Sequence, residues 1–383
     1  NNSVVLKLVF HERALSREVL DFFVFLSPGD VWRGTAKSMG NNRLGIESSD
    51  DSALYVPTGT NSCPAAVATS VGFNPSNVIS VSGQDANFTY LTVLQARTFN
   101  AATTVSVNGV TTPLGAAPVD KAKILRAYSD ACNANTPFTA LSTNDAVTGD
   151  VTMRSASNGN VLSLPMVALD TVNNIQYHKI GQYTAFNGLA TDPVTGVSIG
   201  KGPIEDALWA NDFVIPFNLT AGNQTYATVT FPTKEEFHSG IPSSSYFSNP
   251  AITGIANVTA KAPTVSLVAR NEKEETISNT GCYISPCAAD PVNQLPAELN
   301  VLALSTATGL GNAGVVNTSG YERGWVNMNI QSFASTSRAS ANYNNFSQSG
   351  VPALVTVINW ENRNGGLQGT WSYAAKTQMP AAR

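Results

Sequence analysis

The stretch SREVLDFFVFLSPGDVW, Ser16–Trp32, contains nine apolar residues in seventeen, and the interpretation of the whole chain starts from it. In an extended strand, the apolar residues from Leu20 to Leu26 at even positions point to one side, and those from Val19 to Phe25 at odd positions point to the other. Both sides are apolar except at Asp21. The pattern therefore predicts a strand that is buried on both faces.

The next four residues, Ser27–Asp30, predict a turn. Pro28 suits the second position of a β-turn, and Gly29 suits the third position, where a positive φ is needed. We expect a hairpin that delivers Val31 and Trp32 to a second strand, with Trp32 closing the core. The core motif expected from the stretch consists of Phe22, Val24, Leu26, Pro28, Gly29 and Trp32.

Short runs rich in Val, Ile, Thr, Phe and Tyr recur between clusters of Gly, Pro, Asn and Asp, which is typical of strands. Two stretches, near 122–132 and 203–212, have the character of short helices. The sequence predicts an all-β protein of immunoglobulin-like β-sandwich architecture, with a large loop-rich insertion and one or two short helices. The predicted strands are Val4–Phe10, Val19–Leu26, Phe88–Leu94, Val161–Leu169, Asp212–Phe217, Tyr226–Phe231, Thr264–Ala269, Leu299–Leu304, Trp325–Ile330, Ala353–Asn359 and Gly369–Ala374.

The density of strand signals predicts three segments along the chain. Residues 1–47 supply the first strands of the main sandwich, and residues 203–383 supply the remainder. Residues 48–202 are rich in Ala, Thr, Gly, Asn and Pro, and we expect them to form a loop-rich insertion or second lobe.

Charged residues make up only 13% of the 383-residue chain, so neutral polar groups must cover most of its surface. This composition is typical of secreted and cell-surface proteins. The net charge of −4 creates no strong field, and no run of Lys or Arg is interleaved with aromatic residues, which argues against nucleic acid as a partner. No apolar run approaches the roughly 18 to 20 residues that span a bilayer, so no transmembrane segment is expected. The chain starts at Asn1 directly before a strand, and we expect an export signal to precede it.

The four cysteines, Cys63, Cys132, Cys282 and Cys287, lie in polar, turn-rich surroundings, which favours disulfides in an oxidising compartment. Three pairings are open in principle. Cys282 and Cys287 enclose only four residues, so we expect that local bridge together with Cys63–Cys132. The alternative is a metal site, but the spacing is not that of a zinc site and no histidine lies near a cysteine in sequence.

Four stretches carry a resemblance to a known family. They are the opening motif, FVIPFNLTAGNQTYATVTFPTKEEFH at 213–238, GWVNMNI at 324–330, and GVPALVTVINWENRNGGLQGTWSYAAK at 350–376. In this order they resemble a family of uncharacterised secreted proteobacterial cell-surface proteins that carry the SREVLDFxxxLSPxDVW motif. The resemblance implies an extracellular or cell-surface location in a bacterium, and it implies no reaction.

Candidate catalytic groups are sparse. The only compact set is His11, Glu12, Ser16 and Glu18, which would meet at a hairpin loop, although Arg13 and Arg17 are at hand to pair with the carboxylates. His178 and His238 are isolated, and no glycine-rich nucleotide-binding loop is present. We predict no catalytic residues and no enzyme activity; a secreted hydrolase of unknown substrate is the third-ranked alternative.

We expect no cofactor and no metal site. The acidic stretches 47–52 and 142–150 offer oxygen ligands for calcium, but their spacing is not that of calcium loops, and turns collect Asp and Asn for conformational reasons.

The leading functional prediction is a structural extracellular protein that assembles with copies of itself into a filament or surface layer. Few charged residues are available to prevent its edge strands from pairing with a strand of another copy. The tail KTQMPAAR at 376–383 is one candidate for the segment that a neighbouring copy would contribute. The alternative is a surface adhesin that binds glycans or another cell through exposed rings. The candidate rings are Trp325, Trp360, Trp371, Tyr343 and Phe346.

Overall fold

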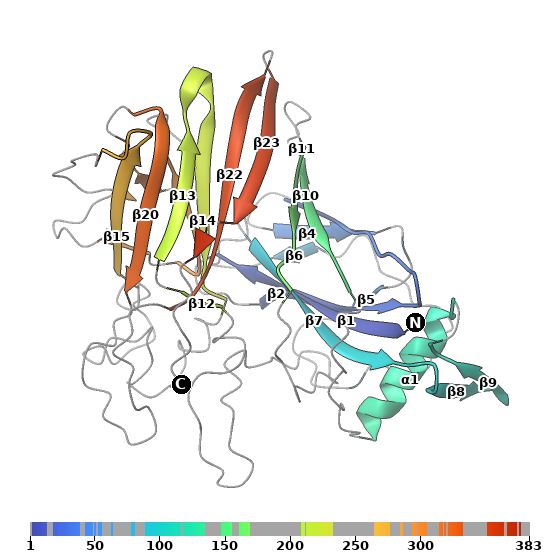
Figure 1. Cartoon of the computed structure of the whole chain (residues 1–383). Coiled ribbons are helices and arrows are strands. Elements are labelled where there is room, and N and C mark those ends of the chain that lie inside the picture. The colour runs from blue at the N-terminus through green and yellow to red at the C-terminus, as the bar shows by residue number, and fades with distance from the viewer. Residues whose placement is uncertain are drawn as a thin grey trace, which may run out of the picture. The chain divides into compact units, whose positions relative to one another are not determined.

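A computed structural model describes the following residues of the chain: 2–13, 18–38, 43–48, 50, 53–55, 63, 78–80, 89–115, 118–134, 147–154, 161–168, 208–210, 212–232, 264–275, 284–285, 293–295, 297–304, 314–316, 318, 321–331, 351–363, 366–373 and 375–376. Strands make up most of these residues, and α1 (Lys121–Asn133) is their one regular α-helix. The expected all-β class is confirmed at this level (Figure 1). Two compact units divide the described residues, the first up to Val147 and the second from Thr148.

The first unit is built on a four-stranded antiparallel sheet in the order β5-β2-β1-β7. All ten residues of the central strand β1 are buried, because β2 and β7 pair with its two edges and both of its faces are covered. The other small sheets of this unit are β3-β4-β6 and the hairpin β8-β9. The strands are β1 (Ser3–Glu12), β2 (Glu18–Leu26), β3 (Thr35–Ser38), β4 (Arg43–Glu47), β5 (Ala53–Tyr55), β6 (Val78–Ser80), β7 (Thr89–Phe99), β8 (Thr104–Val107) and β9 (Val110–Pro113).

The opening motif forms β2, and the expected burial on both faces is confirmed. Leu20, Phe22 and Val24 on one face belong to a hydrophobic core together with alternate residues of β1. Phe23 and Phe25 on the other face are 0–1% exposed and pack against the ring of Tyr128, with centroids 5.2 and 6.2 Å from it. The alternation in the sequence therefore matches two separate apolar layers.

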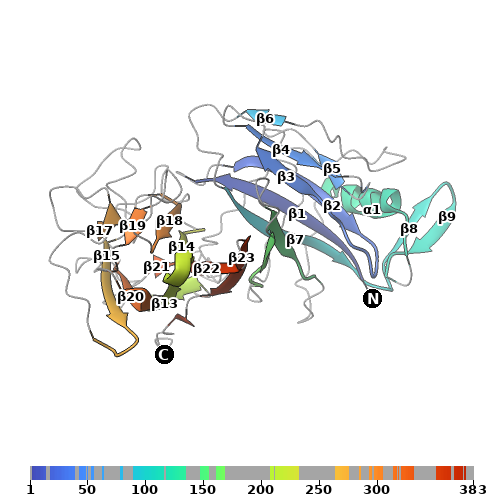
Figure 2. The ribbon, with the colours of Figure 1, turned by 90° about the horizontal axis from the view of Figure 1, so that it is seen from above.

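Helix α1 covers the second of these faces (Figures 1 and 2). The Asp120 side chain caps its first turn, accepting a hydrogen bond from the Ala122 backbone N–H at 2.8 Å. Its buried side chains recur at helical spacing and form one stripe toward the sheet. They are Ile124, Leu125, Tyr128, Ser129 and Cys132. The helix expected at 122–132 is confirmed.

The turn expected after β2 is present, but the prediction that a second strand of a hairpin follows it is wrong. The Asp30 N–H donates to the Ser27 carbonyl at 3.1 Å, and Gly29 has a φ of 78°, as the third position of this turn requires. Residues 31–34 then form no strand, and Val31 is 63% exposed. The antiparallel partners of β2 are instead β1, the preceding strand, and β5, so β2 has no open edge to pair with a strand at Val31.

The second unit contains two larger sheets. One has the order β17-β15-β20-β13-β24 and is antiparallel; the other has the order β16-β19-β18-β14-β22-β23 and is antiparallel except for the pair β18-β19. The strands are β12 (Trp209–Ala210), β13 (Asp212–Asn218), β14 (Gln224–Thr230), β15 (Thr264–Asn271), β16 (Ile284–Ser285), β17 (Asn293–Gln294), β18 (Leu299–Ala303), β19 (Gly314–Val316), β20 (Arg323–Gln331), β21 (Val351–Pro352), β22 (Leu354–Arg363), β23 (Gly366–Tyr373) and β24 (Ala375–Lys376).

A single hydrophobic core of the second unit draws side chains from both sheets. Phe213, Ile215 and Phe217 of β13 belong to it, as do Val355 and Val357 of β22 in the other sheet. A short 3₁₀ turn, Thr220–Gly222, joins β13 to β14 and so connects one sheet to the other. The hairpin of β10 (Asp150–Arg154) and β11 (Val161–Pro165) also belongs to this unit.

The division at Val147 differs from the segments expected from sequence, which placed a boundary between residues 47 and 48. The reason is β7, which lies within the expected insertion. It pairs with β1 from Ser3↔Phe99 to Glu12↔Thr89, so residues 1–47 share their sheet with this segment. No described strand from 203–383 enters that sheet.

Two smaller findings concern the helices. The segment expected as a second helix at 203–212 is described only in part, and β12 occupies Trp209–Ala210 there. No helix among the described residues has both the length and the apolar character that crossing a membrane would require.

Candidate functional site

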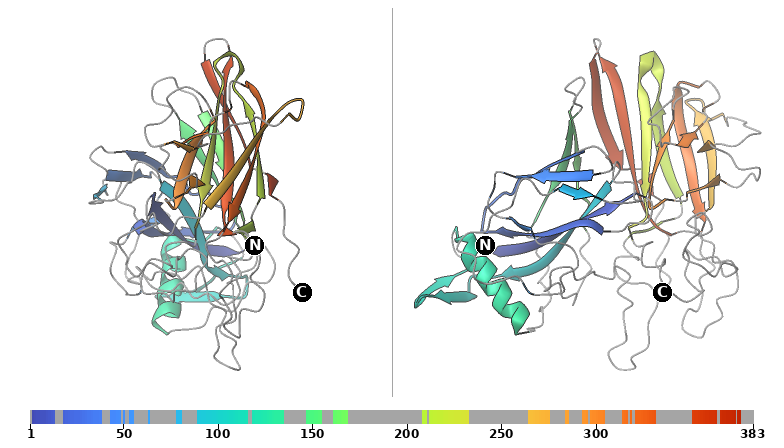
Figure 3. Two further views of the ribbon diagram at one scale, coloured as in Figure 1. Left: turned by 90° about the vertical axis from the view of Figure 1, so that its left-hand side faces the viewer. Right: turned by 180° about the vertical axis from the view of Figure 1, so that it is seen from behind.

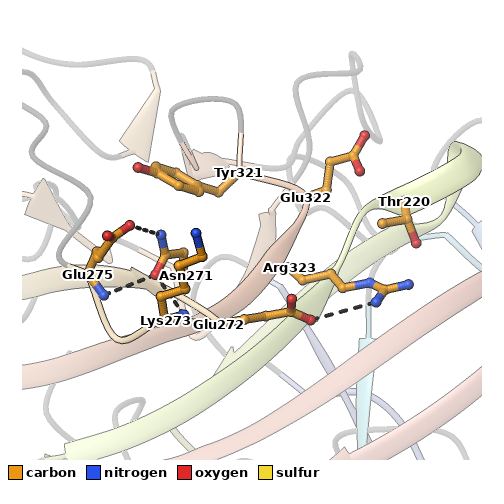
Figure 4. Close-up of a pocket in the computed structure, with 8 residues that line it drawn as sticks. All are labelled: Thr220, Asn271, Glu272, Lys273, Glu275, Tyr321, Glu322 and Arg323. Carbon is orange, nitrogen blue, oxygen red and sulfur yellow. Dashed lines mark hydrogen bonds and ion pairs between the residues drawn. The ribbon is translucent and has the colours of Figure 1, made fainter.

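An open hollow of about 560 Å³ lies at one end of the five-stranded sheet of the second unit (Figure 4). Its walls come from three segments: the 3₁₀ turn after β13, the turn that follows β15, and the residues that lead into β20. The lining residues are Thr220, Asn271, Glu272, Lys273, Glu275, Tyr321, Glu322 and Arg323.

The turn after β15 is held by the side chain of Asn271. Its Oδ1 accepts hydrogen bonds from the backbone N–H groups of Lys273 and Glu275 at 2.9 and 3.0 Å, and its Nδ2 donates to Glu275 Oε2 at 2.7 Å. Asn and Asp favour such turns because the side chain replaces a backbone acceptor. Asn271 is 6% exposed, so the turn has a fixed base from which Glu272 and Lys273 extend into solvent.

The charges around the hollow are mixed and exposed. Arg323 and Glu272 form an ion pair at 3.7 Å, and their side chains are 53% and 64% exposed. An exposed pair of this kind contributes at most about 1 kcal/mol to stability. The guanidinium and carboxylate groups of this pair therefore face solvent at the rim of the hollow and contribute little to the stability of the fold.

Gly324 lets two strands approach closely beside the hollow. It has a φ of 154°, and a Cβ at this position would collide with the carbonyl oxygen of Arg270. Gly324 is opposite Asn271 of β15 and Phe217 of β13. Only glycine fits this backbone position, and it allows β20, the strand that carries Trp325, to lie close to β15.

Trp325 lies on the outer face of the same sheet. The neighbouring Val326, Met328 and Ile330 are 0–1% exposed in the core, so the alternate residues from Trp325 to Asn329 face the other way. The register places Trp325 opposite Arg270 on one side and Pro216 on the other. A half-buried indole is thereby flanked by a guanidinium-bearing residue and an exposed proline.

The expected bridge between Cys63 and Cys132 is present, with Cα atoms 5.8 Å apart. It ties the C-terminal turn of α1 to a residue 69 positions earlier. Cys282 and Cys287 lie outside the described residues.

The opening motif is a structural element. Phe22 and Val24 belong to the core, and Leu26 and Trp32 are partly buried against it. Pro28 and Gly29 form the turn and are not core residues, since Pro28 is half-buried and Gly29 is exposed.

The compact catalytic candidates fall at the β1-β2 connection, as expected. His11 and Glu12 are 0% exposed within β1, and the ring of His11 stacks on Tyr90 at 4.6 Å. His11 and Glu18 are register partners, while Ser16 lies outside the described residues. The structure therefore brings His11 and Glu18 side by side. His178 and His238 also lie outside the described residues.

The calcium candidates are described only in part. Asp150 Oδ2 accepts hydrogen bonds from the hydroxyl groups of Thr152 and Ser163 at 3.2 and 3.0 Å, across the β10-β11 hairpin. The Asp50 backbone N–H donates to Ser48 Oγ at 3.1 Å. Within the described ranges, no group of three or more His, Cys, Asp or Glu side chains gathers where a metal ion could bind.

Of the aromatic candidates for glycan binding, Trp325 and Trp360 are half-buried on outward positions of the two sheets, and Trp371 lies in β23. Tyr343 and Phe346 lie outside the described residues. The hollow is not predicted from the sequence, although the run NEKEE at 271–275, at the end of a predicted strand, is a signal of a charged turn there.

Comparisons of the chain with protein-family models, with curated proteins and with solved structures find no match.

Proposed function

We propose that this chain is an extracellular structural protein of the bacterial cell surface that assembles with copies of itself. The observation that carries the proposal is the β8-β9 hairpin of the first unit, whose strand edges are exposed and uncharged. Figure 3 shows it extending beyond α1 in the right-hand view.

The geometry of the hairpin identifies which backbone groups point outward. Asn108 and Gly109 have φ values of 51° and 78°, which fits the two-residue turn that Asn-Gly favours. The residues flanking such a turn, Val107 and Val110, form a hydrogen-bonded pair, so bonding alternates along the ladder. The Leu114 N–H donates a hydrogen bond to the Thr103 carbonyl at 2.8 Å, as expected if every second pair along the ladder, counted from Val107 and Val110, is hydrogen-bonded. Between these bonded pairs, the backbone groups of Thr104 and Ser106 point away from β9.

The outer edge of β8 is suited to pairing. Thr104 and Ser106 are exposed, and no described strand other than β9 pairs with β8. No charged residue occurs between Thr103 and Pro118, whereas soluble proteins often protect such edges with Lys or Pro. Helix α1 occupies one face of the hairpin, where Lys123 Nζ donates to Thr112 Oγ1 at 2.7 Å. The helix therefore supports the hairpin on this face.

Location at the cell surface rests on three observations. The Cys63–Cys132 bridge suits an oxidising compartment, the charged fraction is low, and neutral polar residues make up much of the rest of the chain.

We also infer that the second unit is an immunoglobulin-like β-sandwich. Its support is the single core to which both sheets contribute, with buried residues alternating with exposed ones along β13.

Sedimentation velocity over a range of concentrations tests self-assembly. We expect the disulfide-intact chain to form larger species as its concentration rises. Ser106→Lys places a charge on the outer edge of β8 and should shift assembly to at least about tenfold higher concentration, a change of about 1.4 kcal/mol. Val110→Lys is the matched control, since Val110 is 60% exposed but its backbone groups point toward β8.

Assembly that is equally weakened by both lysines would indicate a general charge effect and not strand addition. A chain that stays monomeric at every concentration, while retaining its fold, would contradict the proposal.

A further inference from the structure

We propose that the outer face of the five-stranded sheet in the second unit binds a neutral oligosaccharide, with one pyranose ring stacked on Trp325. This goes beyond self-assembly and does not depend on it.

Part of this face is exposed at apolar positions. On β13, Val214 is 39% exposed and Pro216 is exposed, although both carry apolar side chains. Some outward positions of the six-stranded sheet are instead buried, with Val301 at 5%, Tyr226 at 8% and Ile358 at 8%, while Thr228 and Trp360 are half-buried. Val214 and Pro216 therefore place exposed apolar groups beside the half-buried Trp325, where a ligand can contact them.

The register of three strands defines the site as three cross-strand rows. In the first row Trp325 lies between Arg270 and Pro216, and in the second Asn327 lies between Val268 and Val214. In the third row Asn329 lies between Ser266 and Asp212. Directly opposite residues in a sheet have Cβ atoms about 4.5–5.5 Å apart, so each row is a continuous strip.

The chemistry of these rows matches a sugar. A pyranose presents C–H groups on its faces and hydroxyl groups at its rim, so it needs a flat apolar surface bordered by hydrogen-bonding groups. Trp325 and Pro216 supply the flat surface, and the amide of Asn327 offers both donors and an acceptor. Asn329 Nδ2 already donates to Asp212 Oδ1 at 2.7 Å, which fixes the orientation of both polar groups.

Charge and size argue for a neutral, small ligand. The three rows carry one cation, Arg270, and one anion, Asp212, so they offer no excess charge to a phosphate, a uronate or a nucleic acid. A stable protein interface takes about 20–30 residues a side, several times more than three short rows provide. A chain of a few sugar units fits this area.

The hollow of Figure 4 continues the site in one direction. Arg270 Nη1 donates to the Glu274 carbonyl at 3.2 Å, which links the first row to the turn that lines the hollow. Tyr321 and Arg323 come just before Trp325 in the chain, and Tyr321 is 38% exposed. A linear oligosaccharide can therefore extend from the indole toward these polar groups.

Isothermal titration calorimetry of the 383-residue, disulfide-intact chain tests the proposal. The probes are cellohexaose, chitohexaose, laminarihexaose and maltohexaose, and a heparin hexasaccharide is the charged comparison. We expect at least one neutral hexasaccharide to bind. Trp325→Ala should weaken its binding at least about tenfold, as expected for a buried aromatic contact. Trp325→Phe keeps an aromatic ring for stacking and should retain most of the affinity. Comparison of the two variants therefore distinguishes loss of the stacking ring from loss of the fold.

Trp360→Ala is the matched control, because Trp360 is a half-buried tryptophan on the outer side of the other sheet. It should leave the affinity unchanged. The proposal is overturned if none of the neutral probes binds at millimolar concentration, if only the heparin hexasaccharide binds, or if binding survives Trp325→Ala or is lost equally in Trp360→Ala.

Discussion

The ring of Trp32 packs against the ring of Phe22, with centroids 5.5 Å apart and an interplanar angle of 58°. Phe22 is 1% exposed within β2, while Trp32 lies in the segment after the turn and is only partly buried. A tilted aromatic pair of this kind attaches an irregular segment to the core of the first unit. A Cβ at Gly34 would collide with the same indole, so Gly34 allows the ring to fold back over the chain.

Truncation of the two rings should have unequal effects. Phe22→Ala removes a fully buried ring and should lower the free energy of unfolding by about 3–5 kcal/mol, whereas Trp32→Ala should cost less, about 2 kcal/mol. Trp32→Phe keeps the ring contact and removes an indole N–H that has no hydrogen-bond partner among the described residues, so it should change stability by less than about 1 kcal/mol. Urea unfolding measures all three; equal losses for both alanine variants would contradict this packing.

Removal of the Cys63–Cys132 bridge should destabilise the first unit. In the chain-entropy model, closing a loop of this length stabilises the folded state by about 4 kcal/mol. The double variant Cys63→Ser/Cys132→Ser should show this loss in urea unfolding. Reduction of the parent protein should destabilise its first unit by about the same amount. Unchanged stability of the double variant would show that the bridge is not formed in solution.

Ionisation of Tyr128 should destabilise the fold at high pH. Burial raises the pKa of Tyr128 above its usual range, and the positive charge of Arg97 opposes this only in part. The hydroxyl therefore stays protonated in the folded state above pH 10, where a tyrosine in the unfolded chain loses its proton. By linkage, its contribution is fully present below about pH 10 and is lost progressively above it.

Tyr128→Phe tests this directly. The parent protein should lose stability between about pH 10 and 11.5 more steeply than the variant, by up to about 1.4 kcal/mol per pH unit. Matched urea titrations at each pH give the difference. Identical slopes would mean that the ring of Tyr128 is accessible to water in the folded state.

Gly324→Ala should destabilise the second unit because the new Cβ meets the Arg270 carbonyl oxygen. We expect a loss of about 2–4 kcal/mol, within the range for strain and overpacking. Gly109→Ala is the control: it has a similar backbone requirement, with a φ of 78°, but no atom within 4 Å, so it should cost about 1 kcal/mol. Equal effects would show that the close approach at Gly324 is absent.

Local patterns in the sequence predicted the elements but not their partners. The alternation in β2 predicted two buried faces, and the spacing of Ile124, Leu125 and Tyr128 is that of a helix stripe. The pairing of β1 with β7 joins Ser3 to Phe99, and nothing in either strand's own pattern specifies this distant contact. The residue types around Pro28 predict the turn, but they do not specify that β2 pairs with β1 and β5.

The candidate sites differ in the same way: a site within one segment can be predicted from the sequence, but a site built from several segments cannot. Asn108-Gly109 between Val-rich runs is a strong hairpin signal that was present in the sequence and not used. The hollow combines Thr220, Asn271 and Tyr321 from three separate segments, which only the paired strands bring together. Trp325 was noted as a candidate ring, but its position between Arg270 and Pro216 required the register.

The measurement that tests the central claim most directly is amide hydrogen exchange in the β8-β9 hairpin, compared between dilute and concentrated protein. The N–H groups of Val105 and Val107 point toward β9 and should be protected in both samples. Those of Thr104 and Ser106 point outward, so they should exchange freely in the dilute sample and become at least about tenfold slower as the chain associates. Association that leaves the exchange of Thr104 and Ser106 unchanged would contradict strand addition at β8.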